Sequence, residues 1–229
     1  MRSTFLPYAR QWIDERDIEA VAAVLRGDYL TTGPLIPELE SRIARVVGAK
    51  YAVAFANGTA ALHAACHAAG IGNGDEVITT PMTFAASANC ILYQQGTPVF
   101  ADIDERTYNL DPRDVERKLT DRTKAIVAVD FTGQPAPLTT LRYLCARHGL
   151  VLIEDAAHAL GATYRGNRVG SISDMTMFSL HPVKHVTSGE GGVITTDSET
   201  YWRKLLDFRN HGIVREKERL EHPNPAAWY

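Results

Sequence analysis

The sequence predicts an α/β protein in which a mostly parallel sheet carries helices on both faces. From Lys50 onward, short apolar runs alternate with segments of helical pattern. These runs are nearly continuous, as in strands that are buried on both sides of a parallel sheet. With 229 residues, of which 45% are hydrophobic, the chain is long enough to bury a large core. We expect one large domain over residues 1–229, made of an N-terminal helical segment (1–50), an α/β core (51–212) and a C-terminal end (213–229).

Two amphipathic helices are expected ahead of the α/β core. The first covers residues 14–26, where apolar residues recur at helical spacing at Ile18, Val21, Ala22 and Leu25. Asp14 is its expected N-cap, and Gly27 ends it. The second covers residues 37–47, and the apolar residues on one of its faces are Leu39, Ile43, Val46 and Val47.

Alternating strands and helices are expected from residue 51 onward. The expected strands are 51–56, 76–80, 97–103, 124–130, 150–155, 175–180 and 192–196. The expected helices are 58–70, 84–96, 111–119, 138–148 and 198–210. Only loop separates the last two strands, so the strand–helix alternation ends there. The last residues, 221–229, have a turn-like composition.

Composition and charge exclude several classes of function. The 24 Lys+Arg and 27 Asp+Glu residues give a net charge of −3, whereas a dedicated nucleic-acid surface is basic. Three cysteines that lie far apart fit neither a disulfide framework nor a zinc knuckle, so we expect buried, reduced thiols at Cys66, Cys90 and Cys145. The sequence shows no signal-peptide core and no apolar stretch long enough for a membrane span. We expect a cytoplasmic protein without a nucleic-acid or membrane partner.

The turn Asn57-Gly58-Thr59 is the first candidate site, because ligands of an open parallel sheet bind outside the carboxyl ends of its strands. Gly58 lets the backbone approach a ligand closely. Thr59 and the free N–H groups of the first helical turn could bind a phosphate. Any strand-to-helix turn could share these features, so the turn alone does not decide. The chain has neither a P-loop motif nor a dinucleotide-binding glycine pattern.

Asp155 is the second candidate, since it ends the apolar strand LVLIED. A carboxylate in such a place needs a cationic partner or several hydrogen-bond donors. It is either a structural ion pair or helix cap, or an anchor for a protonated heterocycle.

Lys184 is the third candidate, because it follows an apolar strand and lies in a loop crowded with His, Ser and Gly. Partial burial would lower the pKa of its amine and make it a usable nucleophile, although a lone lysine is more often a solvated charge. His181 and His185 have the spacing of a metal pair but lack further ligands, so we expect no metal site.

Together these three candidates provide what pyridoxal 5'-phosphate requires. They offer a phosphate cradle, a carboxylate for the ring nitrogen and a lysine for the aldehyde. Their order along the chain places all three at one edge of the sheet. The combination is much more specific than any one of its parts.

The chain resembles the DegT/DnrJ-type nucleotide-sugar aminotransferases, which have the aspartate-aminotransferase-like fold, fold type I. The motifs that carry the resemblance span nearly the whole chain: YLTTGP (29–34), NGTAAL (57–62), PMTF (81–84), EDAAH (154–158) and the segment 179–192. Segment 179–192 and the RNHG motif (209–212) look most like the pseudaminic-acid branch. The members of this branch are UDP-4-amino-4,6-dideoxy-N-acetyl-β-L-altrosamine transaminases.

The resemblance implies a role for each candidate residue. Lys184 would bind the cofactor aldehyde and shuttle a proton between substrate and cofactor, and Asp155 would pair with the ring nitrogen. His158 would lie beside the ring near its phenolic oxygen. Phe84 would stack on the ring face, unless it is a core aromatic at the start of a helix. Contacts to the phosphate or sugar are implied for Gly58, Thr59 and Ser179, and weaker substrate contacts for Tyr8, Asp28, Tyr29, Leu30 and Thr31.

The resemblance also implies the reaction and the partners. L-glutamate would give its amino group to the cofactor and leave as 2-oxoglutarate. The amino group would then pass to C4 of a UDP-linked 4-keto-6-deoxy-N-acetylamino sugar, the pseudaminic acid precursor. Analogy at the level of the fold suggests a homodimer with the active site at the interface.

The sequence departs from the family in one respect. Family members continue into an Asn-x-Arg segment and a smaller C-terminal domain, whereas this sequence stops at Tyr229. We therefore expect the N-terminal, large-domain portion of such an enzyme. Alone it would bind cofactor weakly, turn over poorly and expose an apolar surface.

Three alternatives remain open. A dehydratase relative of this fold carries histidine in place of the Schiff-base lysine, which Lys184 opposes. The substrate could be another nucleotide-linked 4-keto sugar, such as a precursor of perosamine or aminoarabinose. The chain could also be a truncated, non-catalytic remnant or a regulatory binding module. The intact Lys184, Asp155 and Thr59 oppose this last reading, and the missing C-terminal domain favours it.

Overall fold

The structure is a computed structural model that describes residues 5–214 and 217–219. Its larger strands are β1 (Tyr51–Phe55), β2 (Glu76–Thr79), β3 (Thr97–Phe100), β4 (Thr123–Val129), β5 (Val151–Asp155), β8 (Met175–Ser179) and β9 (Gly192–Thr196). Its helices are α1 (Glu15–Arg26), α2 (Leu35–Val47), α3 (Gly58–Ala68), α4 (Ala86–Tyr93), α5 (Pro112–Lys118), α6 (Leu138–His148) and α7 (Glu199–Arg209). The shorter elements are the hairpin strands β6 (Thr163–Tyr164) and β7 (Asn167–Arg168) and the 3-10 turns η1 (Phe131–Gly133) and η2 (Lys217–Arg219).

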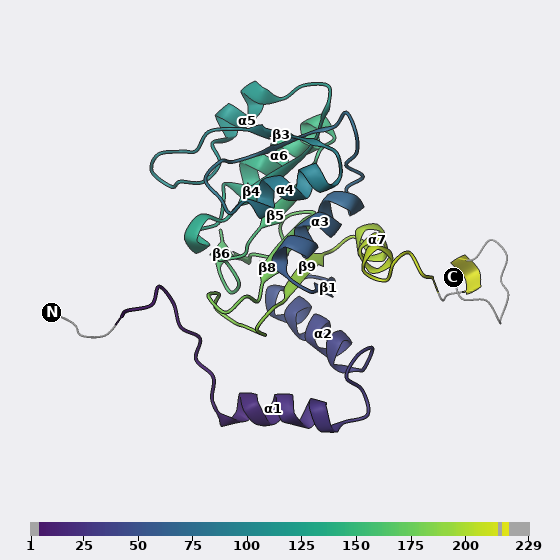
Figure 1. Ribbon diagram of the computed structural model, residues 1–229. Coiled ribbons are helices and arrows are strands. Elements are labelled where there is room, and N and C mark those ends of the chain that lie inside the picture. The colour runs from purple at the N-terminus through teal and green to yellow at the C-terminus, as the bar shows by residue number, and fades with distance from the viewer. Residues whose placement is uncertain (1–4, 215–216, 220–229) are drawn as a thin grey trace.

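A seven-stranded sheet forms the centre of the molecule in the order β1-β9-β8-β5-β4-β2-β3 (Figure 1). The pairs β8–β5, β5–β4, β4–β2 and β2–β3 are parallel. Strand β9 is antiparallel to both of its neighbours, β1 and β8. The expected mostly parallel sheet is therefore confirmed, with β9 as its reversed strand.

Successive strand residues face opposite helical layers. One core lies between the sheet and α3, α4 and α7, and its strand residues are Val53, Val77, Ala125, Val127, Ile153, Met175, Met177 and Ile194. On the other face, α5 and α6 cover Ile78, Ile126, Ala128 and Leu152. There α2 packs against Ala52, Ala54 and Val193. Because both faces are covered, the strand sequences are nearly continuous in apolar residues.

The carboxyl ends of β1, β4, β5 and β8 meet at one edge of the sheet, because these strands run in the same direction. Asp155 and Ser179 end β5 and β8, while Asn57 and Asp130 follow β1 and β4. Strand β9 starts at this edge with Gly192. The fold therefore brings the polar candidates of the sequence together at one edge.

The first helix forms as expected, but its apolar face is not buried. Asp14 caps α1 and makes a capping box with Asp17. In Figure 1, α1 lies apart from the α/β body, and none of its residues is buried. Ile18, Val21 and Leu25 are among the exposed large apolar residues. Helical spacing identifies an apolar face but not the surface that covers it.

The second helix starts two residues earlier than expected and buries three of the four residues on its expected face, fully or in part. Val47 and Ile43 are buried and Leu39 packs beside them. The expectation for Val46 is wrong, since it is 51% exposed.

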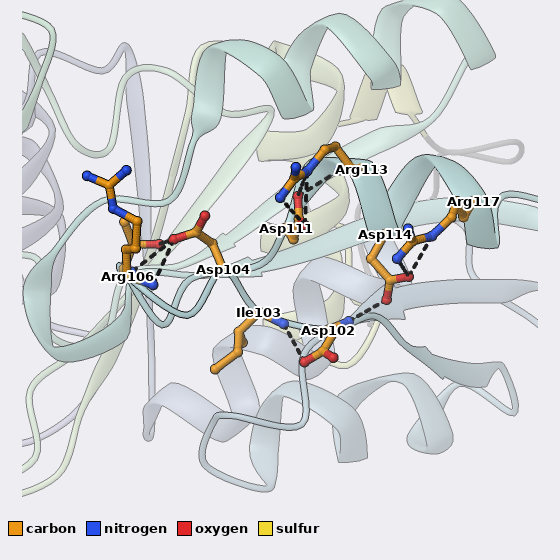
Figure 2. Close-up of polar contacts among 9 residues, drawn as sticks. Asp102, Ile103, Asp104, Arg106, Asp111, Arg113, Asp114 and Arg117 are labelled. Atoms are coloured by element: carbon orange, nitrogen blue, oxygen red, sulfur yellow. Dashed lines mark hydrogen bonds and ion pairs between the residues drawn. The ribbon is translucent and has the colours of Figure 1, made fainter.

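Carboxylates hold the segment between β3 and α5 (Figure 2). Asp111 caps α5 by accepting the N–H of Arg113 at 3.0 Å. Asp114 accepts the N–H of Asp102 at 2.6 Å and pairs with Arg117 at 2.7 Å. These residues lie near β3, which is the outer strand on the opposite side of the sheet from β1. They therefore stabilise a part of the fold that is far from the candidate site.

The remaining expectations have mixed outcomes. Cys66, Cys90 and Cys145 are buried free thiols, as expected. The β6–β7 hairpin was not predicted, since two residues per strand are too few to give a period-2 pattern. The turn-like end, 221–229, lies outside the described residues.

Candidate active site

The turn between β1 and α3 forms the first wall of the site. The Asn57 side chain caps α3 by accepting the N–H of Ala60 at 2.8 Å. Gly58 and Thr59 occupy the first two helical positions, where backbone N–H groups have no acceptor within the helix. A Cβ on Gly58 would lie 3.4 Å from the Cβ of Ser179. The turn therefore rests on the end of β8 and can present N–H donors to an anion.

Gly192 makes this close packing possible. It lies in β9 between Phe55 of β1 and Ser179 of β8. A Cβ at this position would be 2.5 Å from the carbonyl carbon of Asn57 and 2.7 Å from the nitrogen of Gly58. Only a residue without a side chain fits beneath the turn, so Gly192 determines how near the turn approaches β8.

Asp155 lies at the end of β5 with 5% of its surface exposed. One carboxylate oxygen accepts the Ser87 hydroxyl at 2.6 Å, and the other accepts the N–H of Ala157 at 3.2 Å. Burial raises the pKa of Asp155 above its ordinary value, although these two hydrogen bonds and the charges of His158 and Lys184 act in the opposite direction. The expected donors are present, and Ser87 is one that the sequence did not reveal.

Lys184 and His158 face each other across the site. The Nζ of Lys184 lies 2.6 Å from the Nε2 of His158. Burial lowers the pKa of Lys184, although the charge of Asp155 opposes this effect. Burial and the charge of Lys184 also lower the pKa of His158. Partial burial of Lys184 thus has the expected effect, and the pair favours an uncharged amine.

Gly133 packs against the backbone carbonyl group of His158. Its φ is +94°, and a Cβ there would lie 2.6 Å from the carbonyl oxygen of His158. Both the backbone conformation and the space require glycine. The turn after β4 therefore positions the histidine of the site.

A second pair of carboxyl groups lies behind Asp155. Asp130 and Glu154 are 1% and 0% exposed, and Asp130 Oδ2 and Glu154 Oε1 have no hydrogen-bond partner among the described residues. Burial, followed by the charge of Glu154, raises the pKa of Asp130 to about 9. Burial also raises the pKa of Glu154. The pair therefore retains a proton at neutral pH, which limits the negative charge next to Asp155.

Phe84 precedes α4 and is 77% exposed. The alternative of a core aromatic is therefore wrong. Stacking on a cofactor ring remains a prediction for this side chain.

The expected substrate residues of the N-terminal segment are not buried against the sheet edge. Tyr8 is 97% exposed, Tyr29 63% and Leu30 70%. Asp28 and Thr31 are exposed as well. Their contact with substrate remains a prediction.

Within the described ranges, no three His, Cys, Asp or Glu side chains are grouped so that they could hold a metal. In the same ranges, no helix has the length and apolar character needed to span a membrane.

Comparison with known families shows the family to which this chain belongs. The profile of the DegT/DnrJ/EryC1/StrS aminotransferase family matches residues 11–227. The chain belongs to this family. The resemblance inferred from the motifs is therefore confirmed at the level of the family.

Two curated relatives match the chain over its whole length. SpsC of Bacillus subtilis, a spore coat polysaccharide biosynthesis protein, is 43% identical over 228 residues. The uncharacterized protein MJ1066 of Methanocaldococcus jannaschii is 41% identical over 229 residues. The chain spans 58% and 59% of the lengths of these two relatives.

Solved structures of aminotransferases share the fold. The aminotransferase from Psychrobacter cryohalolentis has a TM-score of 0.90 at 37% identity, covering 97% of this chain and 57% of its own. PseC of Helicobacter pylori, an aminotransferase involved in the biosynthesis of pseudoaminic acid, has a TM-score of 0.87 at 32% identity and covers 95% and 59%. DesI, solved with its TDP-sugar product, has a TM-score of 0.84 at 41% identity and covers 89% and 52%. The fold type I assignment is confirmed.

The residues of this site fit the family's cofactor, pyridoxal phosphate. Spr1654, a similar protein from Streptococcus pneumoniae, has been solved in PLP and PMP forms. The buried carboxylate of Asp155 has hydrogen-bond donors but no ion pair within the described part of the chain, so it remains available for a protonated ring nitrogen. Gly58 and Thr59 open α3, where backbone N–H groups without an acceptor in the helix could bind a phosphate. Lys184 supplies an amine whose pKa is lowered.

Proposed function

We propose that this protein is a pyridoxal phosphate-dependent aminotransferase that aminates a nucleotide-linked keto sugar. Membership of the family and the composition of the site support this proposal. The observation that carries it is the pair formed by Lys184 and His158, with nitrogens 2.6 Å apart, beside the buried carboxylate of Asp155. A structural lysine would pair with a carboxylate at the surface, whereas this one faces another base.

The roles of the binding residues follow from their positions. The Gly58 and Thr59 N–H groups would hold the phosphate, with Ser179 beside them. Asp155 would pair with the ring nitrogen, and Phe84 is available to cover a ring face. Pyridoxal phosphate, when bound, supplies the electron sink that amino transfer requires. These residues orient that sink toward the substrate.

Lys184 and His158 are the residues that move protons. Burial lowers the pKa of both, and the charge of Lys184 lowers the pKa of His158 further, so one member of the pair is uncharged near neutral pH and can accept a proton. Lys184 Nζ is the group that would hold the cofactor through its aldehyde, and as a free amine it would carry a proton to or from the substrate carbon. His158 would hold Lys184 in place and receive its excess proton.

Within this class we propose L-glutamate as the amino donor and a UDP-linked 4-keto-6-deoxy-N-acetylamino sugar as the acceptor, with transfer to C4. The similarity to PseC and the motifs at 179–192 and 209–212 support this choice. The similarity to DesI, solved with a TDP-sugar product, supports another nucleotide 4-keto sugar as the second candidate. A cytoplasmic homodimer is part of the same proposal.

An amino-transfer assay tests the proposed function. The chain is incubated with pyridoxal phosphate, L-glutamate and either the UDP-linked or a TDP-linked 4-keto-6-deoxy sugar, alone and mixed with the C-terminal part of SpsC. We expect amination of the UDP sugar, faster in the mixture, and a loss of at least about 1,000-fold in Lys184→Ala. Amination of the TDP sugar alone would favour the second candidate. Absence of amination in every mixture would contradict the proposal.

A further inference from the structure

A chain of two hydroxyl groups leads from the start of α4 to the buried carboxylate of Asp155. Thr83 Oγ1 lies 2.7 Å from Ser87 Oγ, and Ser87 Oγ lies 2.6 Å from Asp155 Oδ2. Ser87 is 0% exposed, while Thr83 is only partly buried. An ionised carboxylate can only accept hydrogen bonds, so Ser87 must donate to Asp155 and Thr83 must donate to Ser87.

The direction in which these two hydroxyl groups donate depends on the charge of Asp155. When the carboxylate is an anion, both hydroxyl groups donate toward it, and each bond polarises the next. When Asp155 is protonated, it becomes a donor and competes with Ser87 for the same contact. The arrangement therefore stabilises the anion more than the acid.

The other groups around Asp155 do not replace this contact. Lys184 and His158, from the loop after β8 and the turn after β5, act on it only through space. Asp130 after β4 and the Cys90 thiol of α4 also interact with it electrostatically. Neither supplies positive charge. Apart from the N–H of Ala157, Ser87 is the direct donor to this carboxylate.

Ser87 is itself held firmly. It lies in the first turn of α4, and its carbonyl oxygen accepts the Cys90 Sγ at 3.3 Å. The Sγ of Cys90 in turn lies 3.5 Å from the Sγ of Cys66 in α3. The hydroxyl is therefore fixed between two packed helices and needs no rearrangement to donate.

We propose that Ser87, supported by Thr83, is a positioning residue that holds Asp155 as an oriented anion for the ring nitrogen of the cofactor. The proposal rests on the proposed function, since it assigns Asp155 to that nitrogen. It adds a residue of α4, 68 positions from Asp155 in the sequence, to the machinery of the site.

The test is a spectrophotometric titration of the purified chain with pyridoxal phosphate between about pH 6 and pH 9. We expect Ser87→Ala to weaken binding roughly ten-fold at pH 8 and further at lower pH, because more of Asp155 is then protonated. Ser87→Thr keeps the hydroxyl and should bind within about three-fold of the original chain. Thr83→Val should show a smaller loss with the same pH trend.

Ser173→Ala is the matched control. The Ser173 hydroxyl donates to Glu154 at 2.8 Å, so it also bonds a buried carboxylate, one residue from Asp155. Its loss should leave cofactor binding within about two-fold at every pH. If Ser87→Ala does not fold, cofactor binding is measured as a function of pH on Thr83→Val and Ser87→Thr. These two variants then show whether the effect on binding depends on pH or is merely structural.

The outcomes separate the two proposals. If the original chain binds the cofactor through Lys184 and the Ser87 and Thr83 variants have its affinity and pH profile, the role of Ser87 is wrong and the function stands. If the original chain forms no adduct that requires Lys184, the proposed function is wrong. The role of Ser87 can then still be read from the ligand-free chain. In the ligand-free chain, Ser87→Ala should lower the free energy of unfolding more at pH 8 than at pH 5. An equal loss at both pH values would overturn the role of Ser87.

Discussion

Replacing Gly192 by alanine is expected to lower the free energy of unfolding by roughly 2–4 kcal/mol and to weaken pyridoxal phosphate binding at least ten-fold. The added Cβ would collide with the backbone of Asn57 and Gly58, at 2.5 and 2.7 Å. Backbone atoms cannot rotate away as a side chain can. The turn must therefore move off β8, and the N–H donors of α3 move with it.

Denaturant unfolding and a cofactor titration check this expectation. Gly72→Ala is the matched control, since the nearest atom to its new Cβ is a side-chain oxygen of Asp75 at 3.9 Å. The control should change stability by less than about 1 kcal/mol and leave binding unaltered. Equal behaviour of the two alanine variants would show that the turn does not depend on Gly192.

Asp130→Asn is expected to remove the pH dependence that this buried acid imposes on the free energy of unfolding. The pKa of Asp130 is raised to about 9, chiefly by burial and then by the charge of Glu154. The stability that this group contributes is complete below the unfolded pKa near 4 and is lost as pH rises toward 9. Asparagine keeps the shape but carries no charge, so the variant does not undergo this loss.

The measurement is the free energy of unfolding of both proteins as a function of pH. The advantage of Asp130→Asn over the original chain should grow by on the order of 4 kcal/mol between about pH 5 and pH 8. Asp114→Asn serves as a control of opposite sign. Hydrogen bonds from the Asp102 N–H and Arg117 lower the pKa of Asp114. That variant should lose stability at neutral pH and regain parity with the original chain in acid. A constant difference for Asp130→Asn would show that Asp130 is ionised in the fold.

Periodicity and strand ends predicted most of the architecture. Continuous apolar runs predicted the larger strands, because a strand that is buried on both faces is apolar at nearly every position. The rule that parallel strands end at one edge grouped Gly58, Asp155 and Lys184 correctly. Asp155 at the end of LVLIED was recognisable because a carboxylate there needs compensation.

The contacts that complete the site depend on pairings that local patterns do not encode. Strand β9 inserts between β1 and β8, which places Gly192 under the Asn57 turn. Nothing in the local sequence distinguishes Ser87 from other residues of a small-residue helix, because its contact with Asp155 forms only when α4 packs on the sheet. The pair formed by Asp130 and Glu154 also depends on strand pairing, because the raised pKa of Asp130 arises only when two strand ends lie side by side. Their long sequence separation explains why sequence reasoning did not find them.

The most direct test of the central claim is the visible absorption of the purified chain titrated with pyridoxal phosphate, beside Lys184→Ala. If Lys184 holds the cofactor next to Asp155 and His158, a yellow band appears in the original chain. Borohydride then fixes the cofactor on Lys184, and the alanine variant shows neither effect. Folded protein that gives no such band, or gives the same band without Lys184, would contradict the assignment of this site as the cofactor site of an aminotransferase.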